Sequence, residues 1–346
     1  MHNEKHNFAY PVKLGQVTKV SEHDVTAFRT EDIPHQRVAI TLSNRGFIKR
    51  VPMQAHLLVH HGNKGIIGMV TREDDAVRLM IAADTHDNIM FFTNRGKVFR
   101  TRCYEIPAKT FRTAKGTAVV NLFPIAECEK ISAMIPVTEL KPELQLLMVT
   151  RNGEIKKTPL DKFAAIRSSG IIAMDLEAGD ELVAASLVTD QDDVMLVTQK
   201  GKVIRFAVGS LRASSRMSGG VRGVKLTSDD QVVGVDIARP KSFILLVTVN
   251  GYGKLVPVTS YQQQKRGGGG VKTFSLNDKT GPLATAKLVT EKQQLMMISA
   301  DGIVISTYIR DKKLRQGIAV RSRGTQGVCL IRLDPGDKVV AIAVFD

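Results

Sequence analysis

A short loop that places cations beside a run of glycines has the clearest chemical potential in the chain. Residues 261–273 read YQQQKRGGGGVKT. Glycine leaves backbone amides unshielded, and cationic side chains beside such amides suit the binding of phosphate groups. The loop is not a nucleotide P-loop, because it lacks the Gly-Lys-Ser/Thr that opens a helix. The predicted phosphate-binding residues are Gln264, Lys265, Arg266, Gly267, Gly268, Gly269, Gly270 and Lys272.

Other reactive side chains lack the partners that catalysis or metal binding requires. His60 and His61 are adjacent, but no Cys, Asp or Glu stands at ligand spacing from them. The acidic doublets at 192–193 and 229–230 fit turns between strands better than paired catalytic carboxylates. We therefore expect no catalytic site, no metal site and no cofactor in this chain.

The glycine-rich loop belongs to one of six sequence repeats. Each copy has an apolar run, a tight turn and a basic-apolar run, as in VMLVTQKGKVIRF at 194–206. The turn glycines recur every 48 to 57 residues, at Gly46, Gly96, Gly153, Gly201, Gly251 and Gly302. A period of this length with β-branched, alternating segments predicts four strands per repeat and a closed propeller-like ring.

The repeats divide the chain into two parts. We expect an N-terminal extension or linker at 1–35 and an all-β, six-bladed β-propeller-like ring at 36–346. The six repeats span approximately 36–85, 86–140, 141–190, 191–239, 240–290 and 291–346.

An arginine precedes the loop glycine at the same place in five of the six repeats. We name these segments the slot loops: 112–116, 167–170, 216–220, 264–270 and 323–327. In the first repeat the same place reads VHHGNKG at 59–65, with His61 where the arginine would be. Arginines at one station of a ring form a track along its rim, and phosphate contacts set affinity without reading base sequence. The slot arginines are Arg112, Arg167, Arg216, Arg266 and Arg323.

Further cations are candidates for the same rim. One set follows the turn glycines, where a solvated strand face is as good an interpretation as a DNA contact for each single residue; it comprises Lys49, Arg50, Lys97, Arg100, Lys156, Lys157, Lys202, Arg205 and Lys254. The other candidates lie in or near the slot loops: Lys115, Arg222 and Arg321.

Composition indicates the kind of partner. The chain has 49 Lys and Arg against 34 Asp and Glu, a net charge of +15, and a pI near 9.8. Such an excess of positive charge indicates an anionic partner, and nucleic acid is the leading candidate. The absence of Trp and the 5% aromatic content leave few stacking platforms for single strands, which favours duplex DNA.

No apolar run approaches ~18 residues, so a membrane is disfavoured. Three scattered cysteines without a signal sequence suit an intracellular protein.

Several segments together resemble the C-terminal domain of the bacterial DNA gyrase A protein over roughly 36–346. They are the six hairpins, NGYGK at 250–254, TAKGTAVVNLFP at 113–124, GTQGVCLIRL at 324–333 and the slot loop at 264–270. The family's gyrase A box reads Gln-basic-Arg-Gly-Gly-basic-Gly, and here Gly269 replaces its second basic residue. The box usually belongs to the first repeat, where only Gly62, Lys64 and Gly65 fit and His60 and His61 replace the cations.

The resemblance implies a β-pinwheel that wraps duplex DNA as the non-catalytic part of an ATP-hydrolysing type IIA topoisomerase. The implied partners are the gyrase A breakage-reunion domain and the gyrase B protein. The resemblance also implies a ring that is itself monomeric, and a place in the bacterial cytoplasm at the nucleoid. It does not include the breakage-reunion domain, so we expect no catalytic tyrosine here. The chain is expected to bend or wrap duplex DNA without sequence specificity.

Two alternatives stay open beside DNA wrapping by a gyrase-type domain. A topoisomerase IV-type protein or stand-alone paralogue would bend DNA weakly, as the altered first slot suggests. A protein-interaction propeller would present apolar loop patches and a near-neutral rim, which the charge of +15 disfavours. An enzyme on a propeller scaffold is the remotest alternative.

Overall fold

The computed structural model describes residues 33–53, 75, 77–110, 114–301, 303–311 and 316–345. By its internal contacts the chain divides into Met1–Pro34 and His35–Asp346. Apart from residues 33–35, the extension expected at 1–35 lies outside the described residues, as does the first-repeat slot at 59–65. The account below concerns the unit that starts at His35.

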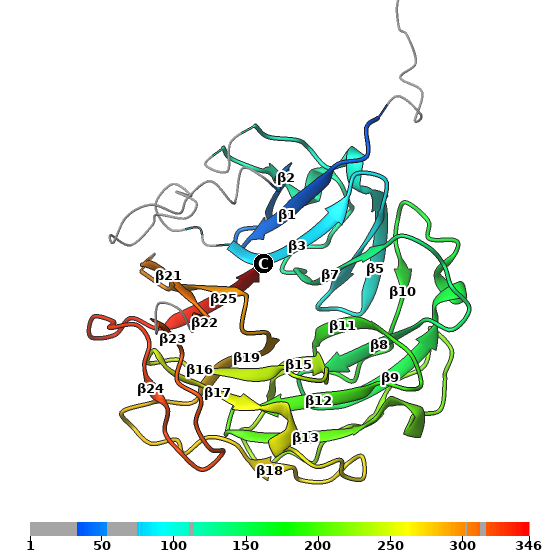
Figure 1. Ribbon diagram of the computed structural model, residues 1–346. Coiled ribbons are helices and arrows are strands. Elements are labelled where there is room, and N and C mark those ends of the chain that lie inside the picture. Colours follow the sequence, from blue (N-terminus) through cyan, green and yellow to red (C-terminus); the bar gives the residue numbers. More distant parts are fainter. Residues whose placement is uncertain are drawn as a thin grey trace, which may run out of the picture. The chain divides into compact units, whose positions relative to one another are not determined.

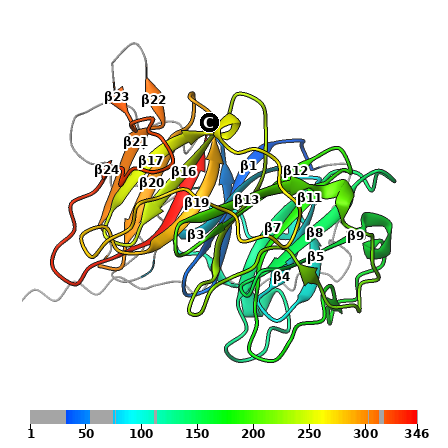
Figure 2. The same ribbon diagram turned by 90° about the horizontal axis from the view of Figure 1, so that it is seen from below.

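Six antiparallel sheets follow one another around this unit like the blades of a propeller (Figure 1). Each repeat supplies two long strands joined by a tight hairpin, followed by a third long strand on the inner side (Figure 2 shows the same strands from below). The innermost strands are β3 (Val77–Asp84), β7 (Ile131–Val137), β11 (Leu182–Val188), β15 (Val232–Ile237), β19 (Leu283–Val289) and β25 (Val339–Phe345). Each innermost strand contacts the next, and β25 contacts β3, so the ring closes.

The two hairpin strands of each repeat lie outside the innermost strand. The first members are β1 (Arg37–Ser43), β4 (Asn88–Thr93), β8 (Gln145–Thr150), β12 (Asp193–Thr198), β16 (Phe243–Thr248) and β20 (Gln294–Ser299). The second members are β2 (Phe47–Pro52), β5 (Lys97–Arg102), β9 (Glu154–Pro159), β13 (Lys202–Ala207), β17 (Tyr252–Pro257) and β21 (Val304–Tyr308). The turn needs glycine: Gly201 between β12 and β13 has a φ of +77°, a conformation that costs other residues energy.

The outermost strand of a blade comes from the following repeat. Five two-residue strands fill this place: β6 (Thr117–Ala118), β10 (Ile171–Ile172), β14 (Val221–Arg222), β18 (Val271–Lys272) and β24 (Val328–Cys329). Thus β18 of the fifth repeat pairs with β13 of the fourth. In the sixth blade the described residues form three strands, and a separate ribbon joins β22 (Arg310–Asp311) to β23 (Gln316–Gly317).

The predicted all-β, six-bladed ring is therefore confirmed, with four strands in five blades and three described strands in the sixth. One revision concerns the origin of the fourth strand. The sequence suggests that each repeat builds its own four strands, whereas the fourth strand of a repeat pairs with the outer edge of the preceding blade. The polar stretch that follows each hairpin is long enough to reach the outer edge of the preceding blade. A strand at that edge pairs with backbone groups that an open edge would leave unpaired.

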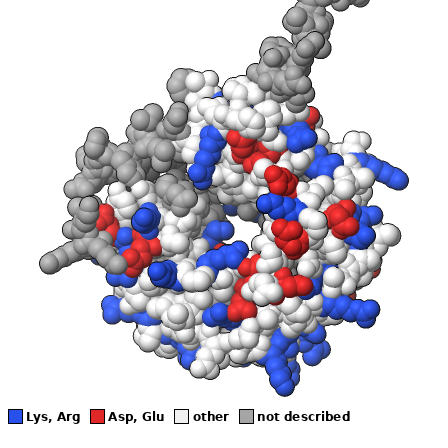
Figure 3. Space-filling model, turned by 45° about the vertical axis from the view of Figure 1, so that its right-hand side comes forward, with Lys and Arg blue, Asp and Glu red and all other residues white. Residues whose placement is uncertain are grey.

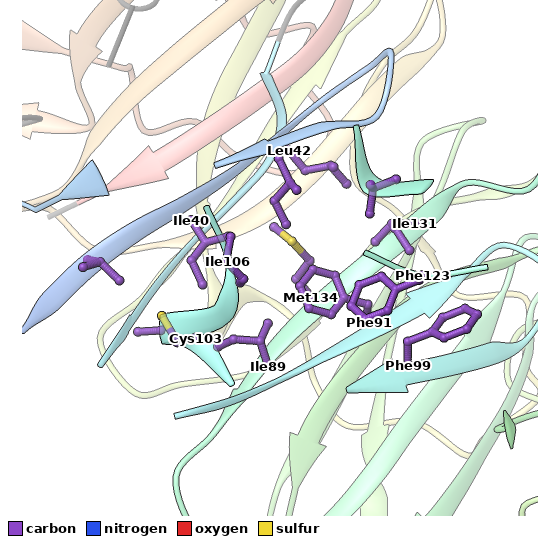
Figure 4. Packing of buried hydrophobic residues seen from close by; sticks show 14 residues of the cluster. Ile40, Leu42, Ile89, Phe91, Phe99, Cys103, Ile106, Phe123, Ile131 and Met134 are labelled. Carbon is purple, nitrogen blue, oxygen red and sulfur yellow. The ribbon is translucent and has the colours of Figure 1, made fainter. Parts of the chain in front are cut away.

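Apolar side chains fill the spaces between neighbouring blades. Strand residues alternate between the two faces of a sheet, so each blade packs on both neighbours. Figure 4 shows the cluster between the first two blades, where Ile40 and Leu42 of β1 meet Phe91 of β4 and Met134 of β7. The Phe91 and Phe123 rings lie 4.9 Å apart in the same cluster. Full burial of each such side chain stabilises the fold by about 1.5–3 kcal/mol, which makes the ring a firm support for surface loops.

Candidate nucleic-acid interface

The glycine-rich slot loop of the fifth repeat lies on the outer edge of the fourth blade. It follows a 3₁₀ turn at Val258–Ser260 and ends in β18, which pairs with β13. The Gln264 amide donates to the Arg205 carbonyl at 2.7 Å, so the loop is attached to β13 at both ends. Lys265, Arg266 and Lys272 are exposed at this edge.

Two lysines stand together where the loop joins the blade. Lys272 of β18 lies directly opposite Lys202 of β13 in the strand register. Like charges directly opposite on a sheet repel each other, so this rung contributes nothing favourable to the fold. In the third blade the equivalent rung places Arg222 of β14 opposite Glu154 of β9, two residues of opposite charge.

The slot loop of the fifth repeat is joined to β14 of the fourth repeat and to the residues that follow it. The Arg266 guanidinium donates to the Arg222 carbonyl at 2.6 Å. The Gly267 amide donates to the Gly223 carbonyl at 2.8 Å, and the Lys225 amide donates to the Gly268 carbonyl at 2.9 Å. The arrangement recurs one repeat earlier, where Arg216 donates to the Ile172 carbonyl at 3.0 Å.

The other cations expected in or near the slot loops occupy the same outer edge in successive blades. Lys115, Arg167, Arg222 and Arg321 are exposed, whereas Arg216 and Arg323 are half-buried. The Arg323 guanidinium lies 5.9 Å from the centre of the Tyr261 ring, so it touches the preceding repeat. Arg112 and the first-repeat residues His60, His61, Gly62, Lys64 and Gly65 lie outside the described residues.

Figure 3 shows how charge is distributed over one face of the ring. On this face Lys and Arg project along much of the periphery and also lie beside the central opening, and Asp and Glu form patches between them. The cations that project at the periphery attract a polyanion to the outer edge.

Four of the strand lysines do not face solvent, which corrects the expectation that they contact DNA. Lys49, Lys156, Lys157 and Lys254 are 5%, 2%, 3% and 0% exposed. The loop of the following repeat covers the outer edge of each blade and encloses these side chains. Lys157 forms an ion pair with Asp190, and the other three ammonium groups donate to loop carbonyls, so none of the four can reach a phosphate in this structure.

Three strand arginines also attach one repeat to the next. Arg50 donates to the Ile106 and Tyr104 carbonyls at 2.7 and 3.1 Å, and Arg100 donates to the Ala164 carbonyl at 3.0 Å. Arg205 donates to the Tyr261 carbonyl at 3.1 Å and pairs with Asp193 at 2.7 Å. Their guanidinium groups therefore hold the loops of the following repeat against the blade. Lys97 and Lys202 at the outer rung remain half-exposed.

Enclosure changes the acid–base properties of the buried lysines. Burial lowers the pKa of Lys254 to about 8. Burial also lowers the pKa of Lys156 to about 8, with Asp175 opposing and Arg216 assisting the change. Loss of hydration disfavours the charged form, which is the cause in both cases.

The acidic doublets serve turns. The Asp230 carboxylate accepts hydrogen bonds from the Lys200 and Gln231 amides at 2.9 and 3.0 Å. Asp192 accepts from the Thr189 amide at 2.8 Å and pairs with Arg239 at 2.6 Å. Within the described ranges, no group of three or more His, Cys, Asp or Glu side chains is placed to hold a metal ion. No helix in that same part of the chain is long and apolar enough to span a membrane.

A signal for the buried lysines was present in the sequence. Three residues after the turn glycine, the first, third and fifth repeats have Lys49, Lys156 and Lys254. The second, fourth and sixth repeats have Phe99, Ile204 and Ile305. A position that alternates between lysine and large apolar residues indicates a buried site, because the apolar residues would otherwise be exposed.

Comparisons with known proteins place the whole ring in context. The family described as the DNA gyrase C-terminal domain, beta-propeller, matches residues 39–84, 87–138, 145–189, 192–239, 242–290 and 317–346. The DNA gyrase A protein of Dehalogenimonas lykanthroporepellens is 48% identical over 329 residues, which cover 95% of this chain and 40% of that protein. Its Escherichia coli counterpart is 36% identical over 310 residues, covering 90% of this chain and 35% of that protein.

Solved structures agree with these sequence matches on the fold. A DNA gyrase A C-terminal domain superposes with a TM-score of 0.74 at 23% identity, covering 90% of this chain and all of that one. The C-terminal domain of a DNA topoisomerase IV superposes with a TM-score of 0.73 at 21% identity, covering 91% and 94%. The chain spans about two fifths of the length of the first curated relative.

Proposed function

Because the chain belongs to the DNA gyrase C-terminal domain family, we propose that it binds duplex DNA around its outer edge and bends or wraps it without sequence specificity. The observation that supports this most is the series of exposed cations in or near the slot loops on successive blades, which includes Lys265, Arg266 and Lys272. Bending 20–30 base pairs by 40–90° costs on the order of 1–6 kcal/mol, so many contacts must act together. A closed ring supplies repeated contacts at fixed spacing.

The proposed setting is a type IIA topoisomerase. In that setting the ring would work beside a breakage-reunion domain and a gyrase B protein, in the cytoplasm of a bacterium and on its nucleoid. The ring itself would act as a monomer. Wrapping would then present a nearby DNA segment to the strand-passage gate with a fixed crossing sign.

The change in linking number that the protein traps in a plasmid tests this proposal. A nicked plasmid is ligated in the presence of the protein, the protein is removed, and the linking number is measured. A change that grows with protein concentration supports wrapping, whereas an unchanged linking number overturns it. A small change accompanied by DNA bending would favour the topoisomerase IV-type alternative, and no binding at all would favour a protein partner.

A matched pair of triple variants sharpens the assay. Lys265, Arg266 and Lys272 are replaced by Ala in one protein. In the control, Ala replaces three exposed lysines outside the slot loops: Lys130, Lys141 and Lys292. Both variants lose three positive charges, so only a specific interface makes the first lose wrapping while the second retains it.

A further inference from the structure

We propose that Lys254 and Lys156 are positioning residues, each of which holds the slot loop of the next repeat so that backbone amides on the loop's outer side bind a DNA phosphate. The inference rests on the proposed function, because it assigns part of the same interface. It adds a second kind of contact, made by amides instead of cationic side chains.

Lys254 lies inside a cage of carbonyl groups. Its Nζ donates to the carbonyls of Ser322, Arg323 and Thr325, each at 2.8 Å, and lies 3.2 Å from the Thr325 hydroxyl. The Phe274 ring closes one side, with its centre 4.8 Å from Nζ. The side chain has no exposed surface. A primary ammonium has three donors, and the three carbonyls use all of them.

Lys156 repeats the cage two blades earlier. Its Nζ donates to the carbonyls of Ser215, Arg216 and Ser218 at 2.8, 2.8 and 2.9 Å. These three residues occupy the same places in the fourth repeat as Ser322, Arg323 and Thr325 in the sixth. The same geometry in two repeats of different sequence shows that the cage is a property of the fold and not of one loop. Lys49 reaches the Ala114 carbonyl at 2.7 Å in the first blade.

Inward carbonyls leave the following amides on the outer side. A trans peptide unit points its N–H away from its C=O, so three carbonyls turned toward Nζ turn three amides away from it. In the sixth repeat these amides belong to Arg323, Gly324 and Gln326. Within the described part of the chain none of the three donates to a carbonyl or a side chain.

The fourth repeat has the same three outward donors, on Arg216, Met217 and Gly219, and these are likewise without an acceptor among the described residues. These outward amides are donors for an anion at the outer edge, and the ammonium on the other side of the same peptide groups aligns their dipoles toward it. The ligand chemistry is a phosphodiester oxygen, the one anion that duplex DNA presents at regular spacing.

The intervening loops are supported in another way. Beneath them stand Phe99 and Ile204, which have no donors. A Cβ on Gly170 would lie 2.7 Å from the Phe99 ring, and a Cβ on Gly268 would lie 3.6 Å from the Ile204 side chain. In these two loops a glycine lies over an apolar side chain, where the fourth and sixth repeats place three carbonyls around an ammonium group.

The first experiment needs no variant. Amide resonances of the deuterated ring are recorded with and without a duplex of mixed sequence, about 20 base pairs long. We expect the Gly324, Gln326, Met217 and Gly219 amides to shift on binding. If the duplex binds and these amides stay unchanged, the amide site is refuted while DNA binding stands. If the duplex does not bind, the proposed function itself fails.

The second experiment removes the ammonium and keeps the volume. Lys254→Met takes away the three donors, and Lys254→Ile installs the residue that the fourth blade uses. We expect roughly tenfold weaker duplex binding at pH 7 for each, the value of one charge-assisted contact. Lys292→Met, an exposed substitution of the same type, is the control. Unchanged affinity in both Lys254 variants would contradict the positioning role.

The pH profile separates positioning from simple stability. Among the described residues, burial alone shifts the pKa of Lys254, while Asp175 and Arg216 also act on the pKa of Lys156. DNA phosphates do not titrate between pH 7 and 9, so we expect affinity of the parent protein to fall across this range as the ammonium groups lose protons. A double variant, Lys156→Met with Lys254→Met, should bind more weakly at pH 7 and show no such fall. An equal fall in both proteins would refute the proposal.

Discussion

Lys202 of β13 lies directly opposite Lys272 of β18, so two like charges share one rung at the outer edge of the fourth blade. Repulsion of this kind lowers stability, and a fold selected for stability alone would place an acid at one of the two positions, as Glu154 stands opposite Arg222 in the third blade. The two rungs therefore allow a like-charge pair and an opposite-charge pair to be compared at equivalent places.

Lys272→Gln is expected to raise the free energy of unfolding by about 0.2–1 kcal/mol, because it removes a repulsive cross-strand pair. The same change should make the slope of log K against log salt less negative by about 1, because one phosphate contact is lost. Denaturant unfolding and DNA titrations at several salt concentrations measure the two effects. Arg222→Gln is the control: it lies opposite Glu154, so it removes no like-charge pair, and it should lower affinity without raising stability. Loss of stability in Lys272→Gln would contradict the repulsion.

Arg266→Ala should weaken DNA bending more than any other single cation substitution, because Arg266 is exposed in the slot loop that best matches the family's box. Its stability should change little. Arg205→Ala should act through the fold instead: it leaves the Tyr261 carbonyl without its donor and Asp193 with the Gln263 amide alone, at a cost of about 1–3 kcal/mol. Fluorescence-based bending and thermal unfolding of both variants separate the cases. Equal bending defects at equal stability would show that the box has no special role.

Duplex binding should depend strongly on salt and weakly on sequence. Each phosphate contact contributes about −0.9 to the slope of log K against log salt. Ala at Lys265, Arg266 and Lys272 should reduce that slope by about 3 if all three contact phosphates. Titrations with two duplexes of unrelated sequence provide the test, and a flat salt response or a strong preference for one duplex would count against a backbone-binding rim.

Stability should rise with pH where DNA affinity falls. The pKa of Lys254 and of Lys156 is about 8 in the fold, and an unfolded lysine keeps a pKa near ~10.4. Between these values the unfolded chain binds more protons, so the free energy of unfolding increases with pH over this window. Denaturant titrations at pH 7.5, 9 and 10 measure it. Lys254→Met with Lys156→Met should lack this increase; an identical pH response in both proteins would contradict it.

The first-repeat slot gives a second, independent pH dependence at lower pH. Histidine at 60 and 61 is mostly neutral at pH 7.5, because unperturbed imidazole titrates near ~6.5. Replacing residues 59–65 by the fifth-repeat heptapeptide should increase wrapping at pH 7.5 and remove most of the gain that acidification brings. Linking number change per bound protein at pH 6 and pH 8 measures this for both proteins. Four equal values would mean that the slot does not touch DNA.

The hairpins were predictable because their signals are local. A tight turn with glycine between two β-rich runs fixes both strands, and six copies at one period fix the ring. The family suggested by the slot loops and hairpins is confirmed by the match along the chain. The exchange of the outermost strand was not predictable, because a two-residue strand such as β18 leaves no periodicity to read.

The site was predicted in part, for a related reason. Which side of a strand faces solvent depends on what covers it, and the covering loop comes from another repeat. The sequence therefore predicts Lys254 as a rim cation, whereas the side chain is enclosed. It also predicts Arg205 as a rim cation, whereas the guanidinium donates to the Tyr261 carbonyl beside the slot loop. Loop residues such as Lys265, which nothing covers, are found where the sequence placed them, and their contact with DNA stays a prediction.

The pairing of each outermost strand with the preceding blade also determines how the ring resists a pulling force. DNA held in a bend around the ring would pull outward on every slot loop that it touches. A pull on the 264–270 loop is resisted by the fifth blade, to which the chain returns, and by the β13–β18 ladder and the Gln264–Arg205 bond of the fourth. Within the described residues, neighbouring blades are thereby linked at the five junctions from the first blade to the sixth. Tension applied at one point is shared with the next blade, and a single blade cannot peel away without breaking bonds in another.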